Sequence, residues 1–350
     1  MVVGRLWRLG WVVIILVVAL ASPGVGESAP KSHGVGIWIQ PERLAALGTS
    51  GPAWENLRRA ARKPVPPPNL SDQEDPANVI VLAKALVGVR LGDASLQREV
   101  VEACLAAMGT EKGGRTLALG RELAAYVIAA DLVGLPEADE KRFRAWLKEV
   151  VREDLEGMTL ISTHEKRPNN WGTHAGASRL AVARYLGDDA EVKRIATIFR
   201  GWLGERSAHS GFKFGELDWQ ADREHPVGIN PRGAKREGHD LDGVMPEEQR
   251  RGGRFLWPPP KENYVWEGLQ GAVAQAVMLD EAGFKEVWQW GDQGLRRAFR
   301  WLHEVNRYPA EKDDTWQPHV INYYYRTDFP APVPTKAGKN VGWTDWTHAR

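Results

Sequence analysis

The sequence has a single cysteine, Cys104, so no disulfide can form within the chain. Cys104 lies in an apolar helical pattern with Val100, Val101, Leu105 and Met108, which predicts a small core residue. The chain also lacks a strong net charge, since 46 basic residues face 45 acidic ones. Without a basic field to attract phosphate groups, a nucleic-acid partner is not expected.

The sequence also lacks an apolar run that suits a stable membrane span. The apolar run Trp11–Ala21 is too short to cross a bilayer. It follows Arg5 and Arg8 and ends in Ala19-Leu20-Ala21, a small-residue cleavage pattern. These features predict a signal peptide over residues 1–21 and a secreted or periplasmic protein. An uncleaved anchor is the competing interpretation.

Removal of the predicted signal peptide takes away Arg5 and Arg8 and leaves 44 basic against 45 acidic residues. Any attraction to an anionic ligand must therefore be local. A segment rich in Pro, Gly and Ser follows, and we expect a flexible leader over residues 22–40. Residues 41–350 are predicted to form one catalytic domain.

Strand patterns are absent as well, because no period-two alternation runs long enough to build a sheet. Long helical patterns occur instead, in pairs joined by short Gly-, Asp- or Pro-containing turns. Such helix hairpins bury their apolar faces by stacking, and closing the series gives an α/α toroid; an open solenoid is the alternative. The predicted fold is thus all-α, with helices at 78–91, 96–108, 116–133, 137–155, 171–186, 190–206, 264–282 and 284–304.

One region interrupts the helices. Residues 208–263 show little helical periodicity and carry many Gly, Pro, aromatic and charged residues. A loop of this length in a compact domain is usually functional, and its aromatics argue against disorder. We therefore expect a folded insertion over the cleft. The tail 328–350 is expected to pack across the outside of the domain.

The segment Arg167–Asp188, RPNNWGTHAGASRLAVARYLGD, combines polar side chains with the start of a helix. Asn170 and His174 are four residues apart, which places them on one helical face about one turn from each other. Amide groups and a titratable imidazole would then point together from the first turn. The alternative is a capping Asn and a structural His.

A second polar segment, Gly238–Gly271, contains Arg250, Arg251 and Arg254 close together. Within it, DGVMPEEQRRG (242–252) resembles the D-G-x-x-P-x-E-x-x-R-G signature of alginate lyases with an α/α toroid fold. In that family the signature follows an Asn-Asn-His motif at a helix start, the same order as Asn169-Asn170 here. The sixteen Trp residues are also typical of sugar-binding grooves, although many will be core residues.

The resemblance implies β-elimination on a uronic-acid polymer such as alginate, with an anionic polysaccharide as the partner. In that chemistry Asn and Arg neutralise the sugar carboxylate, a base takes the C5 proton, and a Tyr protonates the leaving oxygen. Carried over, Asn170 is the carboxylate-contacting Asn and Arg251 is the family's Arg. Tyr264 is the expected acid, with Tyr323, Tyr324 and Tyr325 as further candidates.

Two departures from the family pattern affect the proton-transfer groups. Trp171 stands where the family has its His, and Trp257-Pro258-Pro259-Pro260 separates Arg251 from Tyr264. His174 or His239 is then expected to supply the imidazole. The residues predicted to contact substrate are Asn169, Trp171, Arg254, Trp257 and Glu267.

Two other classes of protein remain open. An inverting glycoside hydrolase would need two facing carboxylates, for which Glu216 with Asp218 or Asp240 with Asp242 are candidates. A secreted protein that binds acidic polysaccharide without cleaving it would also suit the Trp and Arg content. The nine His residues show no metal-binding spacing, so no metal or cofactor is predicted, although calcium at the acidic loops stays open.

Overall fold

The computed structural model describes Met1, residues 34–334 and residues 336–350. All features below belong to the unit Ser32–Arg350. The predicted signal peptide, apart from Met1, and most of the predicted leader lie outside the described residues. The domain begins before residue 41, however, because Ile37, Trp38 and Ile39 are buried in the core.

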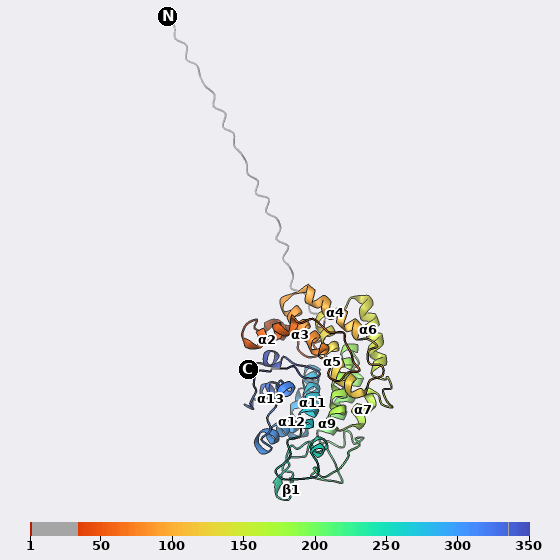
Figure 1. Cartoon of the computed structure of the whole chain (residues 1–350), viewed down its shortest axis with the longest axis vertical. Coiled ribbons are helices and arrows are strands. Elements are labelled where there is room, and N and C mark those ends of the chain that lie inside the picture. Colours follow the sequence, from red (N-terminus) through yellow and green to blue (C-terminus); the bar gives the residue numbers. More distant parts are fainter. Residues whose placement is uncertain (2–33, 335) are drawn as a thin grey trace. The chain divides into compact units, whose positions relative to one another are not determined.

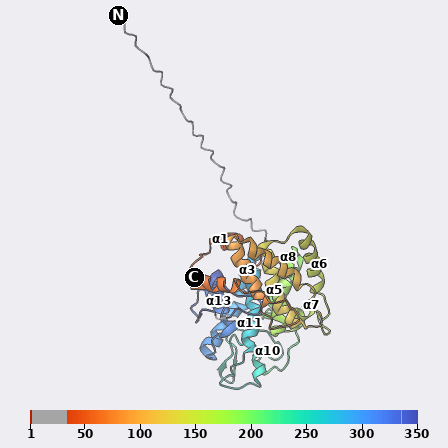
Figure 2. The same ribbon diagram turned by 45° about the horizontal axis from the view of Figure 1, so that its top comes forward.

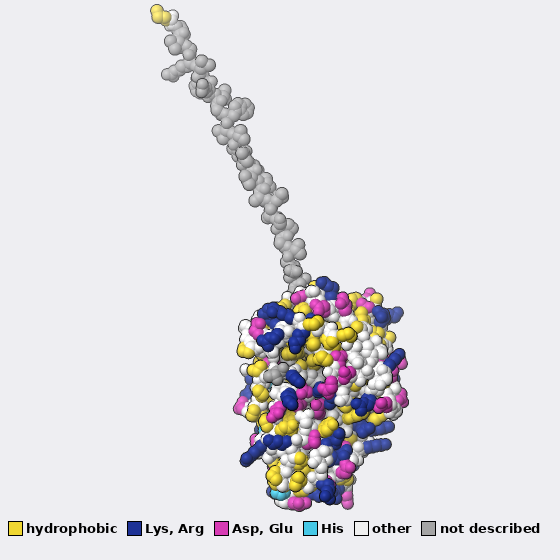
Figure 3. Space-filling view, viewed as in Figure 1, with side chains coloured by type: hydrophobic (Ala, Val, Ile, Leu, Met, Phe, Trp, Pro, Cys, Tyr) yellow, Lys and Arg dark blue, Asp and Glu magenta, His cyan; other side chains and the backbone are white. Residues whose placement is uncertain are grey.

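The regular structure is helical, which confirms the all-α prediction. In the described part of the chain the strands are only β1 (Lys235–Arg236) and β2 (His239–Asp240), a two-residue antiparallel pair. Among the described residues, no helix is sufficiently long and apolar to span a bilayer. Figure 3 shows basic and acidic side chains interspersed over the face in view, as the balanced charge predicts.

Four long helices form the buried layer of the domain (Figure 1): α3 (Ala77–Leu91), α5 (Thr116–Val133), α8 (Asn170–Leu186) and α11 (Tyr264–Glu281). Each packs against the next in this order. Glycines permit the close approach, since a Cβ on Gly120 of α5 would lie 2.9 Å from the backbone nitrogen of Ala175 in α8. A Cβ on Gly271 of α11 would lie 2.3 Å from the carbonyl carbon of Thr173.

The four helices run in the same direction. Near their starts, the side-chain amide of Asn78 in α3 donates to the carbonyl of Arg121 in α5 at 3.5 Å. Near their ends, Arg184 of α8 donates to the carbonyl of Glu281 in α11 at 3.4 Å. The helix starts that carry the predicted site therefore gather at one end of the layer.

Shorter helices connect and cover this layer (Figure 2). The helix α4 packs on α3 and α5, and α9 packs on α8. The pairs α3–α4 and α8–α9 are hairpins of the kind that the sequence predicted, and ring closure into a toroid stays a prediction. The covering elements are α1 (Pro41–Ala46), α2 (Pro52–Ala61), α4 (Ala94–Ala107), α6 (Glu137–Val150), α7 (Leu160–Lys166), α9 (Asp189–Trp202), α12 (Trp290–Arg300), α13 (Gln317–Tyr325) and α14 (Thr344–Thr347).

The helix expected at 284–304 is broken into three pieces. A 3-10 turn, η2 (Lys285–Gln289), precedes α12, and a π-helical turn, η3 (Trp301–Val305), follows it. Gly291, Asp292 and Gln293 have φ angles of 59°, 55° and 57°, outside the helical region. Gly291 approaches Leu203 so closely that a Cβ would lie 2.2 Å from its carbonyl oxygen. The close approach to Leu203, the residue after α9, therefore prevents the continuous helix that the sequence pattern predicted.

The C-terminal tail differs from the expectation that it lies outside the domain. Asn340 and Val341 have no exposed surface. The backbone nitrogen of Lys339 donates to Gln270 of α11 at 2.8 Å, and its carbonyl accepts from Asn78 of α3 at 2.7 Å. The tail thus lies between the first and last helices of the buried layer.

The insertion 208–263 is folded, as its aromatics predicted. Trp219 and Leu241 are fully buried in it. Beside the β1–β2 hairpin it contains the short helix α10 (Pro246–Gln249) and the 3-10 turn η1 (Arg250–Gly252). The helix α10 packs against α11, which brings the DGVMPEEQRRG segment to the starts of the buried helices.

Candidate functional site

The two polar segments meet at Glu248. Its Oε1 accepts a hydrogen bond from the backbone N–H of Asn170, the first residue of α8. Glu248 reaches this position across Gly268 of α11, where a Cβ would lie 3.1 Å from the same carboxylate oxygen. The acidic residue of the D-G-x-x-P-x-E-x-x-R-G segment therefore caps the helix start that carries the Asn-Asn pair, because the N-terminal N–H groups of a helix lack partners within the helix.

Buried polar atoms without partners are concentrated at this helix start. They are Oδ1 of Asn169, both amide atoms of Asn170, Nε2 of His174 and Oε2 of Glu248. All four residues are buried, and Asn170, His174 and Glu248 have no exposed surface. Buried polar groups are paired in the large majority of cases, so these atoms, unpaired within the described residues, are positions for an ordered water or a ligand.

The carboxyl group of Glu248 favours its protonated form. Burial raises the pKa of Glu248 to about 8, opposed by the hydrogen bond from Asn170 and the charge of Arg251. Removal from water penalises the charged form of any carboxyl group. At neutral pH the group is therefore mostly neutral, and it can donate as well as accept a hydrogen bond.

His174 lies one turn inside the helix, within a buried network. The side-chain amide of Asn340 lies 3.2 Å from Nδ1, and Oε2 of Glu267 lies 4.0 Å from Nε2. With the amide nitrogen of Asn340 placed to donate to Nδ1, the ring proton is assigned to Nε2. Burial, together with the charges of Arg121 and Lys339, holds the pKa of His174 well below its usual value, so the ring is neutral.

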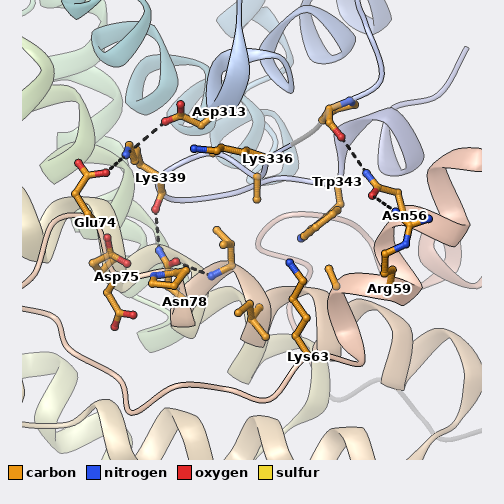
Figure 4. Close-up of a pocket in the computed structure, with 18 of the residues that line it drawn as sticks. Asn56, Arg59, Lys63, Glu74, Asp75, Asn78, Asp313, Lys336, Lys339 and Trp343 are labelled. Atoms are coloured by element: carbon orange, nitrogen blue, oxygen red, sulfur yellow. Dashed lines mark hydrogen bonds and ion pairs between the residues drawn. The ribbon is translucent and has the colours of Figure 1, made fainter.

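Glu267 is tied to a buried arginine. Its Oε2 accepts from Arg121 at 2.6 Å, and Arg121 also pairs with Glu74 at 3.1 Å. Burial raises the pKa of Glu267, and the charge of Arg121 opposes that shift. This pair connects the α8–α11 end of the site to a cavity of about 440 Å³ that Glu74 lines (Figure 4).

Arg251 and Tyr264 lie next to each other on the surface. The guanidinium of Arg251 lies 4.0 Å from the centre of the Tyr264 ring. Tyr264 is 37% exposed and Arg251 is exposed, so a ligand can reach both. Neighbouring Arg250 is occupied by Glu247 at 2.6 Å and by Glu216. Arg251 has no ion-pair partner in the described part of the chain, which leaves its charge available.

Trp171, at the position of the family's His, lies between two cations. The guanidinium groups of Arg115 and Arg167 lie 5.7 Å and 5.3 Å from the centre of its ring. Cations over an indole face are attracted by its electron density. Trp171, Arg115 and Arg167 therefore form a basic, aromatic surface beside Asn170.

The structure does not place all predicted residues at this helix start. His239 lies in β2, where its ring stacks on Trp257 at 4.3 Å. No hydrogen bond or ion pair joins His239 to Asn170 or Arg251 among the described residues. Arg254 lies beside Arg251, and both line a hollow of about 340 Å³ together with Arg250 and Glu216.

The carboxylates considered for hydrolysis are engaged in ion pairs. Asp242 pairs with Arg297 at 2.7 Å, and Asp240 pairs with Arg300 at 3.0 Å. Asp218 pairs with Arg223, and Glu216 pairs with Arg250. Hydrogen bonding by its own backbone and the charge of Arg250 lower the pKa of Glu216, the reverse of what a general acid requires.

Among the described residues, no group of three or more His, Cys, Asp or Glu side chains is arranged to hold a metal ion. Cys104 is a buried core residue, and its thiol donates to the carbonyl of Tyr126 at 3.5 Å. Of the further tyrosine candidates, Tyr324 stacks on Trp288 at 3.9 Å and Tyr323 packs on His348 at 5.3 Å.

Sequence reasoning missed three residues of the site. Glu248 was recognisable as the acidic residue of the signature, but its contact with Asn170 was not. Arg121 and Asn340 stand in apolar or Gly-rich surroundings with no motif to mark them. Both reach the site only through the packing of α5 and the C-terminal tail.

The family model described as alginate lyase matches residues 98–218, so this segment is similar to the alginate lyase family. The matched segment includes the Asn169-Asn170 helix start and ends before the DGVMPEEQRRG segment. The family supports a polysaccharide lyase function in general, and it implies a polysaccharide substrate. Comparison with curated proteins finds no match.

Proposed function

We propose that this protein cleaves an alginate-like polymer of uronic acids by β-elimination. The observation that carries the proposal is the contact between the two polar segments, in which Glu248 binds the backbone of Asn170. The same segment holds Arg251 against Tyr264 at 4.0 Å. An unpartnered amide, an available cation and an accessible phenol are thereby supplied by neighbouring elements.

Arg251 is proposed to bind the C6 carboxylate of the sugar, and Asn170 is proposed to join it when a bound sugar opens the helix start, because Asn170 has no exposed surface in this structure. Neutralising this carboxylate makes the C5 proton more acidic, and the same groups stabilise the negative charge that develops on the carboxyl oxygens. Trp171 and Asn169 would extend the surface for the sugar ring. His174, with its proton on Nε2, would serve as a neutral hydrogen-bond donor behind Asn170.

Tyr264 is proposed to transfer the proton. Its phenolate would accept the proton from C5, the C4–O bond would break as the C4–C5 double bond forms, and the phenol would return the proton to the leaving oxygen. His174 is less suited to be the base, because Asn340 faces its Nδ1 and its Nε2 carries the proton.

The test is an incubation of the protein with alginate, glucuronan and other polyuronates. Elimination creates a C4–C5 double bond conjugated to the carboxylate, which absorbs in the ultraviolet. Growth of this absorbance supports the lyase. New reducing ends without absorbance would instead indicate a hydrolase.

A second candidate is a protein that binds acidic polysaccharide without cleaving it. The observation that favours it is Trp171, held between Arg115 and Arg167 where the family has a His. Binding of alginate with neither absorbance nor new reducing ends would support this candidate over the lyase.

We also propose that the protein is secreted or periplasmic, on the strength of the charged start, apolar run and Ala19-Leu20-Ala21 of the sequence. N-terminal sequencing of the protein recovered from its native producer should begin at Ser22. A protein that retains Met1 would contradict cleavage.

A further inference from the structure

A cavity of about 440 Å³ lies between α2, the start of α3 and the C-terminal tail (Figure 4). This volume falls within the range of roughly 300–1,000 Å³ that is typical of small-molecule sites. Most of its lining lies outside the segment 98–218 that the family model matches. The cavity is therefore a property of this chain that the family match does not explain.

The acidic side chains of the cavity are already engaged. Glu74 pairs with Arg121 at 3.1 Å and with Lys339, and Asp313 pairs with Lys339 at 3.5 Å. Asp75 accepts hydrogen bonds from the backbone of Asn69 at 2.7 Å and of Ala77 at 3.0 Å. Glu74 and Asp313 are thus held in ion pairs, and Asp75 is held by backbone N–H groups.

The basic side chains that line the cavity differ from the acidic ones in their pairing. Arg59 and Lys63, from α2 and the segment after it, and Lys336 of the tail all line the cavity. Arg59 donates to Asn56 at 3.3 Å, and no ion pair occupies Arg59, Lys63 or Lys336 within the described residues. Figure 4 shows the Lys63 side chain extending into the space below Trp343. The cavity consequently presents basic groups to a ligand from both the α2 side and the tail.

Glu122 of α5 supplies a further polar group to the lining of the cavity. It is 1% exposed, it lines the cavity, and its Oε2 has no hydrogen-bond partner among the described residues. Burial and the nearby charge of Asp75 raise the pKa of Glu122 well above its usual value. A protonated carboxyl group there can both donate and accept, as recognition of a hydroxyl group requires.

We propose that this cavity is a binding subsite for one carboxylate-bearing sugar unit. The carboxylate would pair with Lys63 and Lys336, a hydroxyl group would bond to Glu122, and the Trp343 indole would form an apolar wall. Glu74 and Arg121 connect the cavity to Glu267 and, through it, to His174 of the candidate site. Its identification with the polysaccharide substrate rests on the proposed function.

The experiment titrates the full mature chain with sodium D-glucuronate and sodium D-mannuronate, followed by NMR. Glucose and sodium acetate serve as probes that carry only the hydroxyl groups or only the carboxylate. At least one uronate should bind tenfold or more tightly than both. Equal binding of acetate would overturn the proposal, because the cavity would then be a plain anion site, and equal binding of glucose would overturn it as well.

The double variant Lys63→Ala/Lys336→Ala should weaken uronate binding at least tenfold. Both side chains are exposed, so the fold should be retained. Lys148→Ala removes the same charge from the exposed face of α6 and should change the affinity less than twofold. Unchanged affinity in the double variant, or an equal loss in Lys148→Ala, would overturn the subsite.

The ultraviolet assay separates this inference from the proposed function. Elimination with uronate binding that is insensitive to Lys63 and Lys336 would refute the subsite and leave the lyase standing. Uronate binding that depends on both lysines in a protein without elimination would support the subsite and refute the lyase. Absence of any uronate binding would refute the subsite whatever the assay shows.

Discussion

The carboxyl group of Glu248 accepts a hydrogen bond from the backbone N–H of Asn170, which lies 78 positions earlier in the sequence. This contact attaches α10 to the start of α8 and fixes the two polar segments relative to each other. It also explains why a carboxyl group is retained in a fully buried position. With a pKa of about 8, the carboxyl group of Glu248 keeps its proton at neutral pH and still accepts the hydrogen bond from the Asn170 N–H.

The first prediction concerns the dependence of stability on pH. Because the pKa of Glu248 is about 8 when folded and near 4.5 when unfolded, the folded state holds a proton that the unfolded state releases between these values. Stability from this group is therefore full below about pH 4.5 and is lost as pH rises to about 8. The loss should be on the order of 1.4 kcal/mol per pH unit.

Glu248→Gln removes this titration while keeping an oxygen for the Asn170 N–H. Its free energy of unfolding, measured in urea, should be close to that of the native protein at pH 5 and should exceed it at pH 8. If the difference between the two proteins does not change with pH, Glu248 does not titrate in this range.

The second prediction concerns Arg251. Arg251→Ala should lower kcat/KM on the susceptible polyuronate by about a hundredfold to a thousandfold, the usual effect of removing a group that stabilises developing negative charge. Melting temperature should hardly change, because the side chain is exposed. Arg142→Ala removes an arginine that is 65% exposed on α6 and should retain full activity. Near-native activity of Arg251→Ala would refute the carboxylate-binding role.

The third prediction concerns proton transfer by Tyr264. Tyr264→Phe removes only the hydroxyl group and should lower kcat at least a hundredfold, within the usual range for a positioned acid or base. Affinity for the polymer should change little, because the ring remains beside Arg251. Tyr323→Phe is the matched control on α13. If Tyr323→Phe loses more activity than Tyr264→Phe, proton transfer belongs to Tyr323 and the assignment to Tyr264 is wrong.

The fourth prediction concerns acid stability through His174. Its pKa is well below 6.5 when folded, so below pH 6.5 the unfolded state binds a proton that the folded state refuses. Stability is thus lost as pH falls from about 6.5, and His174→Gln should reduce that loss. If the slope of unfolding free energy against pH is the same in His174→Gln and in the native protein, His174 is not a buried neutral group.

Sequence patterns predicted the bounds of helices best for helices that are buried on all sides. The bounds 116–133 agree with α5, every residue of which is buried. The pattern failed at 284–304, because the close approach of Gly291 to Leu203 imposes a break that local periodicity does not record. The helix α7 was missed because its seven residues, LISTHEK, are too few for a clear period.

The candidate site was predictable only where it lies within motifs. Asn170 and Arg251 were selected from two short segments, and the structure joins those segments through Glu248. His239 was selected for its nearness in sequence to Asp242, but it stacks on Trp257 in the hairpin. Asn340 could not be found, because its contact with His174 spans 166 positions and depends on how the tail packs.

The last prediction tests whether close packing of α11 on α8 holds the site together. A Cβ on Gly271 would lie 2.3 Å from the carbonyl carbon of Thr173 and 2.4 Å from the backbone nitrogen of His174. These are backbone atoms of a buried helix, so α8 must shift in Gly271→Ala. Overpacking of this kind typically costs about 1–3 kcal/mol. The shift should also weaken the Asn170–Glu248 contact, so activity should fall more than the loss of folded protein explains.

Gly48→Ala is the control, because its Cβ would meet nothing within 4 Å. Calorimetric unfolding and the ultraviolet assay should therefore both distinguish Gly271→Ala from Gly48→Ala, and equal behaviour would show that α8 tolerates displacement at the site.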